Sequence, residues 1–139
     1  MRKVCLILSV VLAIAVGAGD ALGVLQFQKV FMDEYIVKHK DKEFSEYVQK
    51  KVKCFICHQG KNRKNHNPYG DHLVELLDRK KDTRDVPKIK AALAEVAKMH
   101  SDPRDEKSPT YGEMIAAGKL PGGELEEVMK EPKDEKKSP

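Results

Sequence analysis

The chain has 139 residues, a formal net charge of +4, 35% charged residues and only 6% aromatic residues, with no Trp. Such a chain forms one small domain at most, and its core is marginal at this size and composition. A disulfide scaffold is excluded, because Cys5 lies in the N-terminal segment and Cys54 and Cys57 are three positions apart. We therefore expect another component to complete the core.

The N-terminal segment has the pattern of a secretory signal peptide. Two basic residues precede the apolar run from Val4 to Val16, which only Ser9 interrupts, and small residues follow up to Gly23. The run is too short to span a bilayer comfortably, which favours a cleaved signal over an uncleaved anchor. We predict a signal peptide over residues 1–23, export to the periplasm or an equivalent compartment, and no stable membrane insertion after cleavage.

From Gly23 onward the apolar spacing is helical wherever it is regular, and no alternating segment indicates a sheet. The sequence therefore predicts an all-α fold. A first helix is expected over residues 25–38. A second is expected from Phe44 through His58, with Gly60 as its stop signal.

Capping signals place the remaining helices. Asn67 followed by Pro68 suits an N-cap with proline at the first helical position, and Thr110 with Glu113 has the spacing of a capping box. A helix with an apolar stripe is expected over residues 85–100. The predicted organisation is a signal peptide over 1–23, a helical domain over 24–123, and a short helix over 124–130 leading into a charged flexible tail that ends at residue 139.

The segment Cys54-Phe55-Ile56-Cys57-His58 is the C-x-x-C-H pattern of covalent c-type haem attachment. On a helix, two cysteines one turn apart can form thioethers to the two vinyl groups of one haem, and the next residue can present an imidazole to the iron. The sequence therefore predicts one covalent haem c on Cys54 and Cys57, with His58 as the proximal iron ligand.

Three other interpretations compete with haem attachment. A zinc site needs two more ligands, for which His66 and His72 are available, but no second cysteine pair exists. A redox-active C-x-x-C motif is expected at a strand-to-helix junction, which this helical sequence does not resemble. A disulfide across so short a loop contributes little stability. Haem explains the pattern best, and it also supplies the missing core.

We expect the haem to be surrounded by apolar side chains from several predicted helices. These residues are Phe27, Phe31, Phe55, Tyr69, Leu73, Leu76, Leu93 and Val96.

The distal iron ligand decides between electron transfer and small-molecule binding, because a Met or His there closes the iron whereas an open position admits gases. We favour Met99 or His100 at the end of the predicted 85–100 helix. Met114, His72 and His66 are the other candidates.

Basic residues are concentrated around the haem motif. From Tyr47 to Gly70 the chain has six Lys and Arg residues and no Asp or Glu. Part of this charge offsets the haem propionates, and the rest favours docking of a redox partner with an acidic face. Nucleic acid is not expected as a partner, since the chain carries no recognition motif. A homodimer or heterodimer is compatible with the sequence.

The chain resembles small exported monohaem c cytochromes of planctomycete and anammox bacteria, over residues 27–123. The resemblance lies in the haem motif and in three flanking runs. These runs are Lys61-Asn62-Arg63-Lys64-Asn65-His66-Asn67-Pro68-Tyr69-Gly70, Ser108-Pro109-Thr110-Tyr111-Gly112-Glu113 and Ala117-Gly118-Lys119-Leu120-Pro121-Gly122-Gly123.

This resemblance implies a helical haem domain in a periplasmic or anammoxosome-type setting, and it transfers the haem roles to Cys54, Cys57 and His58. A related anammox cytochrome is a heterodimer with His/Cys ligation that binds NO and CO. The present chain departs from that ligation, because no cysteine follows Cys57.

Two functions follow from these features. The first is a non-enzymatic carrier of single electrons, and the alternative is a haem subunit that binds or senses NO or CO, as part of a heterodimer or alone. A haem enzyme such as a peroxidase is disfavoured, because no acid–base group accompanies the motif.

Overall fold

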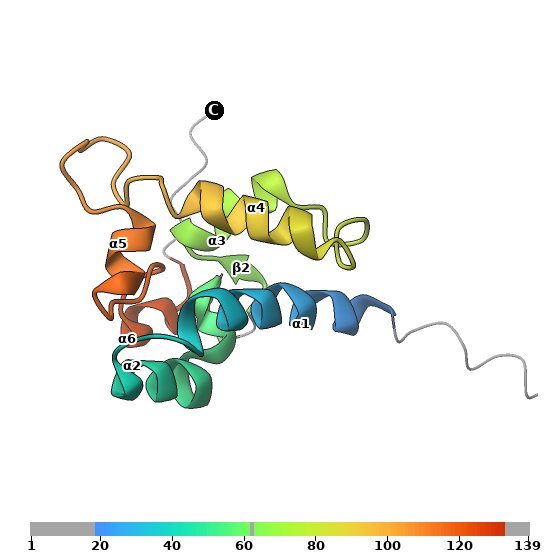
Figure 1. Cartoon of the computed structure of the whole chain (residues 1–139), viewed down its shortest axis with the longest axis horizontal. Helices are drawn as coiled ribbons and strands as arrows, with labels where there is room; N and C mark the ends of the chain where they lie inside the picture. The colour runs from blue at the N-terminus through green and yellow to red at the C-terminus, as the bar shows by residue number, and fades with distance from the viewer. Residues whose placement is uncertain (1–18, 62, 133–139) are drawn as a thin grey trace, which may run out of the picture.

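The computed structural model of the chain describes residues 19–61 and 63–132, with side chains from Leu25 onward (Figure 1). The predicted signal peptide therefore lies mostly outside the described residues, and its last residues form the start of helix α1 (Gly19–Phe31). Among the residues described, we find no helix with both the length and the hydropathy that crossing a bilayer requires.

The first predicted helix is confirmed, although its C-terminal part is π-helical and not α-helical. Helix α1 continues directly into a π-helical turn over Met32–Ile36, in which the Val37 N–H donates to the Met32 carbonyl at 2.9 Å. Helix α2 (Lys42–Tyr47) begins at Asp41, whose side chain accepts from the Phe44 N–H at 3.0 Å. A second π-helical turn over Val48–Val52 extends α2 toward the haem motif.

Helices α3 (Pro68–Leu76) and α4 (Val86–Val96) both begin at the expected kind of cap. The side chain of Asn67 accepts from the Gly70 N–H, and that of Asp85 accepts from the Lys88 N–H. Both α1 and α3 pack against α4, which runs along the top of the molecule in Figure 1. The prediction that α4 extends to His100 is wrong, because the helix ends at Val96.

Helices α5 (Tyr111–Ala116) and α6 (Leu125–Val128) lie together on the left of Figure 1. The predicted capping box is confirmed, since Thr110 and Glu113 each bond to the other's backbone N–H. Gly118 follows α5 with a φ of +73°, the left-handed conformation expected of a C-terminal glycine.

The prediction of an all-α fold requires one correction, because the mostly helical chain contains a small antiparallel hairpin. Strands β1 (His58–Gln59) and β2 (Asn65–His66) pair His58 with His66 and Gln59 with Asn65. Gly60, with a φ of +79°, starts the connection that returns the chain. Periodicity did not predict these strands because each has only two residues.

The core is built from α1 to α5 and from the helical turns that follow α1 and α2, and four of the predicted haem-lining side chains belong to it. Phe31, Tyr69, Leu93 and Val96 are buried in the shared hydrophobic cluster. The other four pack against this cluster and are partly exposed: Phe27, Phe55, Leu73 and Leu76.

The segment after α5 returns to the haem motif. Val128 in α6 is buried, and its carbonyl accepts from the Gly60 N–H at 2.8 Å. The Glu131 side chain accepts from the Lys61 N–H at 3.0 Å. The domain packing therefore extends beyond residue 123 to Glu131, and the tail predicted after it lies mostly outside the described residues, which end at Pro132.

Candidate functional site

The haem motif lies on a tight turn rather than on a long helix. Lys53 has a φ of +50° and a ψ of −117°, which ends the preceding helical turns. A 3-10 turn follows over Lys53–Ile56, closed by the Cys57 N–H donating to the Cys54 carbonyl at 3.2 Å. The prediction of one helix from Phe44 through His58 is therefore wrong. The two cysteines are nevertheless related by one turn, as thioether attachment to a single haem requires.

Asn67 joins the motif turn to helix α3. Its side chain is fully buried, and its Nδ2 donates to the carbonyls of Phe55 and Ile56 at 3.0 and 2.9 Å. Its Oδ1 accepts from the Gly70 N–H at 2.9 Å, and its backbone N–H donates to the Cys57 carbonyl at 3.1 Å. One amide therefore satisfies polar groups from both sides of the hairpin.

Two glycines make room for this connection. A Cβ atom on Gly70 would lie 2.0 Å from the Cys57 carbonyl oxygen, which is backbone and cannot move aside easily. A Cβ atom on Gly122 would lie 2.0 Å from Asn67 Nδ2. A larger residue at position 70 would force the motif turn and α3 apart, and one at position 122 would displace the Asn67 side chain. Both glycines are therefore required by close approach.

The two motif cysteines have different surroundings. Both are free and half-buried. Arg63 Nη1 lies 3.6 Å from Cys54 Sγ, whereas Cys57 packs against the hydrophobic core. Burial, together with the nearby Cys54, raises the pKa of the Cys57 thiol to about 12. Cys57 is thus protonated at neutral pH, and Cys54 is the thiol that faces cations.

His58 provides an imidazole that is suited to binding a metal. Its ring is half-buried, and Nδ1 is buried without a hydrogen-bond partner among the described residues. Burial lowers the pKa of His58, His66 lowers it further, and hydrogen bonds from the ring to the backbone of Asn65 and Arg63 only partly oppose this. A neutral imidazole with an unused ring nitrogen is the form in which histidine ligates iron.

The favoured distal candidates, Met99 and His100, lie in a turn after α4. The Met99 carbonyl accepts from the Tyr111 N–H at 3.0 Å, and Met99 packs partly buried against the core. His100 forms an isolated bridge with Thr110, and its Nδ1 contacts the Ser108 carbonyl. The contacts found for both residues therefore tie them to the segment before α5.

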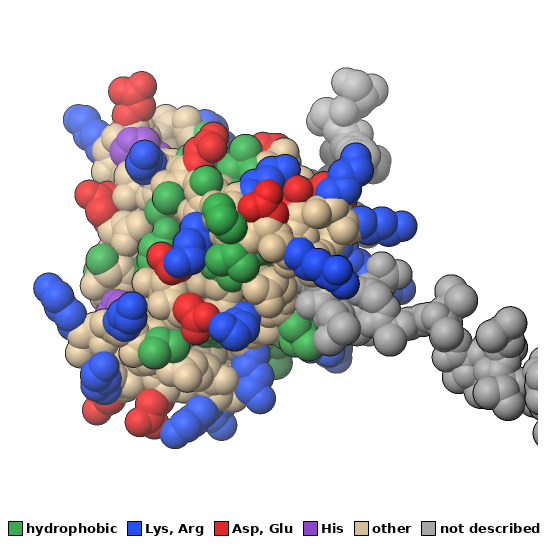
Figure 2. Space-filling view, turned by 45° about the vertical axis from the view of Figure 1, so that its right-hand side comes forward, with side chains coloured by type: hydrophobic (Ala, Val, Ile, Leu, Met, Phe, Trp, Pro, Cys, Tyr) green, Lys and Arg blue, Asp and Glu red, His purple; other side chains and the backbone are tan. Residues whose placement is uncertain are grey.

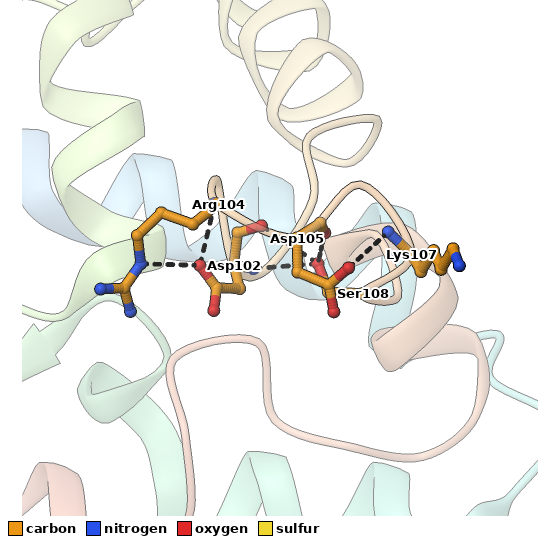
Figure 3. Close-up of polar contacts among 5 residues, drawn as sticks. All are labelled: Asp102, Arg104, Asp105, Lys107 and Ser108. Carbon is orange, nitrogen blue, oxygen red and sulfur yellow. Dashed lines mark hydrogen bonds and ion pairs between the residues drawn. The ribbon is translucent and has the colours of Figure 1, made fainter.

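A self-contained loop holds that segment in place (Figure 3). The Asp102 carboxylate accepts from the Arg104 N–H at 2.9 Å, and the Asp105 carboxylate accepts from the Lys107 N–H at 2.9 Å. The Ser108 hydroxyl donates to the Asp105 carbonyl at 2.7 Å and accepts from the Asp102 N–H at 3.1 Å. The loop thereby positions the carbonyl that contacts His100.

Of the five distal candidates, His66 is the one that the structure brings into ring contact with His58. The ring centroids are 4.9 Å apart, with the ring planes inclined by 33°. His72 instead contacts Tyr111 at 5.8 Å, and Met114 packs against the core. The sequence pattern predicts only a polar loop around His66. The turn glycine Gly60 is the signal that could have indicated the pairing of His66 with His58.

Tyr69 is a further unusual residue beside the motif. It is fully buried between Phe31 and Tyr111, at ring distances of 6.0 and 5.3 Å, and its hydroxyl has no hydrogen-bond partner among the described residues. Burial raises the pKa of Tyr69 well above its usual value. A buried hydroxyl without a hydrogen-bond partner costs stability.

The donor set at this site fits a covalent haem better than a zinc ion. Two thiols one turn apart and a neutral imidazole with a free buried nitrogen match the chemistry of haem attachment. Within the described ranges, no group of three or more His, Cys, Asp or Glu side chains is arranged to hold a metal ion.

Comparisons with known proteins do not assign the chain to a family. No family model, no curated protein and no solved structure matches it.

We predict that Asn67→Ala destabilises the full chain by about 3 kcal/mol, because the carbonyls of Phe55 and Ile56 and the Gly70 N–H lose their partner. Asn67→Asp should be destabilising as well, since it keeps the N-cap acceptor but turns a carboxylate toward those carbonyls. Urea unfolding followed by circular dichroism measures both. Asn65→Ala, at an exposed position in the hairpin, is the control and should change stability by less than about 0.5 kcal/mol. Equal effects at both positions would contradict the role given to Asn67.

Proposed function

We propose that the chain is an exported monohaem c-type cytochrome that carries single electrons to or from a redox partner. Haem c would be held by thioethers from Cys54 and Cys57, with His58 as the proximal ligand. When bound, the haem supplies one-electron chemistry by cycling between the ferric and ferrous states. The supporting observation is the motif itself: two free cysteines are followed directly by His58, whose buried Nδ1 has no hydrogen-bond partner among the described residues.

The residues of the chain would serve this function by holding the attachment turn rigid. Asn67 fixes the carbonyls of Phe55 and Ile56, and Gly70 lets α3 approach the turn closely. Burial keeps the His58 imidazole neutral by lowering its pKa. Such a rigid, largely buried environment favours an electron carrier, because the site changes little between the two oxidation states.

The distal ligand stays a prediction, with Met99 or His100 favoured. In the structure, Met99 and His100 are held by contacts with residues 108–111. Because these contacts compete with ligation of the iron, we retain the second candidate function, a haem protein that binds NO or CO at a weakly ligated or open position. In both cases the protein acts outside the cytoplasm, which rests on the signal peptide predicted over residues 1–23.

The proposed function predicts that co-expression with a cytochrome c maturation system yields a chain with one covalent haem. Mass spectrometry of the denatured protein should show the mass of one haem added. Cys54→Ser/Cys57→Ser should abolish this addition, because no thiol is left to form a thioether. Cys5→Ser is the matched control and should retain the haem. A wild-type chain that acquires no covalent haem under these conditions would contradict the proposal.

A second prediction separates the two functions. If Met99 or His100 ligates the iron, the ferrous protein should keep its absorption spectrum when CO is added, and Met99→Ala or His100→Ala should make it CO-reactive. Met32→Ala serves as the control for a half-buried methionine that is not a candidate ligand. Rapid CO binding by the wild-type protein would instead identify the gas-binding function.

A further inference from the structure

The chain after α5 contacts the tip of the hairpin formed by β1 and β2. We call residues 120–131 the strap; they include α6, on the left of the molecule in Figure 1. The Gly60 N–H donates to the Val128 carbonyl at 2.8 Å, and the Lys61 N–H donates to the Glu131 carboxylate at 3.0 Å. Both donors lie in the connection between the two strands, so the strap holds the turn of the hairpin.

The strap also lies against the base of the hairpin. A Cβ atom on Gly122 would lie 2.0 Å from Asn67 Nδ2, the nitrogen that donates to the carbonyls of Phe55 and Ile56. The Asn67 backbone N–H donates to the Cys57 carbonyl at 3.1 Å, and the Asn67 side chain is fully buried. The strap therefore helps to exclude water from the hydrogen bonds that hold the motif turn.

The strap is anchored less firmly than the helices that form the core. Leu120 belongs to the hydrophobic cluster, and Leu125 packs partly buried against it. Val128 is buried but is not part of that cluster. Helix α6 has only four residues, and no side chain caps its N-terminus. A short uncapped helix that buries little apolar surface opens at a lower free-energy cost than the core does.

We propose that the strap is a latch, which closes on the hairpin and opens locally, before the rest of the fold, to give access to Cys57 and His58. In the closed form Cys57 packs against the core and His58 Nδ1 is buried. Opening breaks the bonds at the hairpin turn and uncovers Asn67, so the motif turn loses its support. The latch goes beyond the proposed function and does not rest on it, because residues of this chain form it entirely.

Hydrogen exchange, followed residue by residue by NMR in the full-length chain with Cys5→Ser, tests whether the opening is local. The backbone amides of Gly60, Lys61 and Asn67 should exchange at rates that do not change with urea at low concentration. Those of Leu93 and Val96 in α4 should instead follow the urea dependence of global unfolding. The same urea dependence for both groups of amides would overturn the latch.

The reactivity of Cys57 reports the open form directly. Full-length chain carrying Cys5→Ser and Cys54→Ser retains Cys57 as its only thiol. In the closed form this thiol is protonated at neutral pH, because burial raises its pKa to about 12. Its reaction with neutral 4,4′-dithiodipyridine should therefore be limited by opening of the strap, and its rate should not change with urea at low concentration.

A strap variant and a matched control use this thiol reaction. Val128→Ala/Glu131→Ala removes a buried side chain and the acceptor of the Lys61 N–H, and it should accelerate the reaction of Cys57 at least about tenfold. Glu126→Ala/Met129→Ala makes the same kinds of change at exposed positions of the strap and should alter the rate by no more than about twofold. A rate that Val128→Ala/Glu131→Ala leaves unchanged would overturn the latch.

A conservative change separates the hydrogen bond of Glu131 from its charge. Glu131→Gln keeps an oxygen that can accept from the Lys61 N–H, so its rate should stay close to that of the wild-type strap, whereas Glu131→Ala should be several-fold faster. Acidic and basic side chains are spread over the face drawn in Figure 2, so the loss of one exposed charge should have little effect of its own. Equal acceleration by both variants would show that charge, and not the latch contact, controls access.

The same exchange measurement on the chain carrying covalent haem separates this inference from the proposed function. The Gly60 and Lys61 amides remain reporters there, and they decide the question if the haem-free chain shows no cooperative unfolding. A folded chain that acquires no haem would overturn the proposed function and leave the latch in place. A chain that neither folds without haem nor acquires it would have no closed strap and would overturn both.

Discussion

The side chain of Asn67 is the interaction on which the rest of the site depends. Lys53 ends the helical turns before the haem motif, and the carbonyls of the partly buried Phe55 and the buried Ile56 need partners from outside those turns. The Asn67 amide donates to both and, through its oxygen, caps α3 at the Gly70 N–H. A single buried amide thus provides hydrogen bonds to the carbonyls of an irregular turn and also caps the first turn of a regular helix. This connection fixes the cysteines relative to the core.

The parts of the fold that could be predicted from sequence depend on local physics. The capping box at Thr110 needs only Glu113, three residues away, and the N-cap at Asn67 needs only Gly70. The apolar stripe of α4 follows from helical periodicity alone, and its members Ile89, Leu93 and Val96 are buried. In each case the interacting groups lie within one or two turns of each other, so the sequence contains the whole interaction.

The parts that sequence reasoning missed depend on contacts between distant segments. Helix α4 ends early because the carbonyl of Ala97 accepts from the Gly112 N–H at 2.8 Å and that of Met99 from the Tyr111 N–H at 3.0 Å, which draws the chain toward α5. Lys53 has a positive φ although it is not a glycine, so its residue type does not predict this conformation. The strands that pair His58 with His66 are too short for periodicity to detect. Residues 128–131 likewise join the site through the backbone of Gly60 and Lys61, about 70 positions away in the sequence.

The two cysteines, equivalent in the sequence pattern, become different in the structure. Cys57 faces the hydrophobic core, where burial raises its pKa to about 12, whereas Cys54 lies beside Lys51, Lys53, Lys61 and Arg63, with Arg63 Nη1 3.6 Å from its Sγ. A group attached to both cysteines would have one side in an apolar environment and another beside basic side chains. The net charge of +4 does not reveal this division. The division depends on where the six basic residues between Tyr47 and Gly70 lie in the fold, and not on their number.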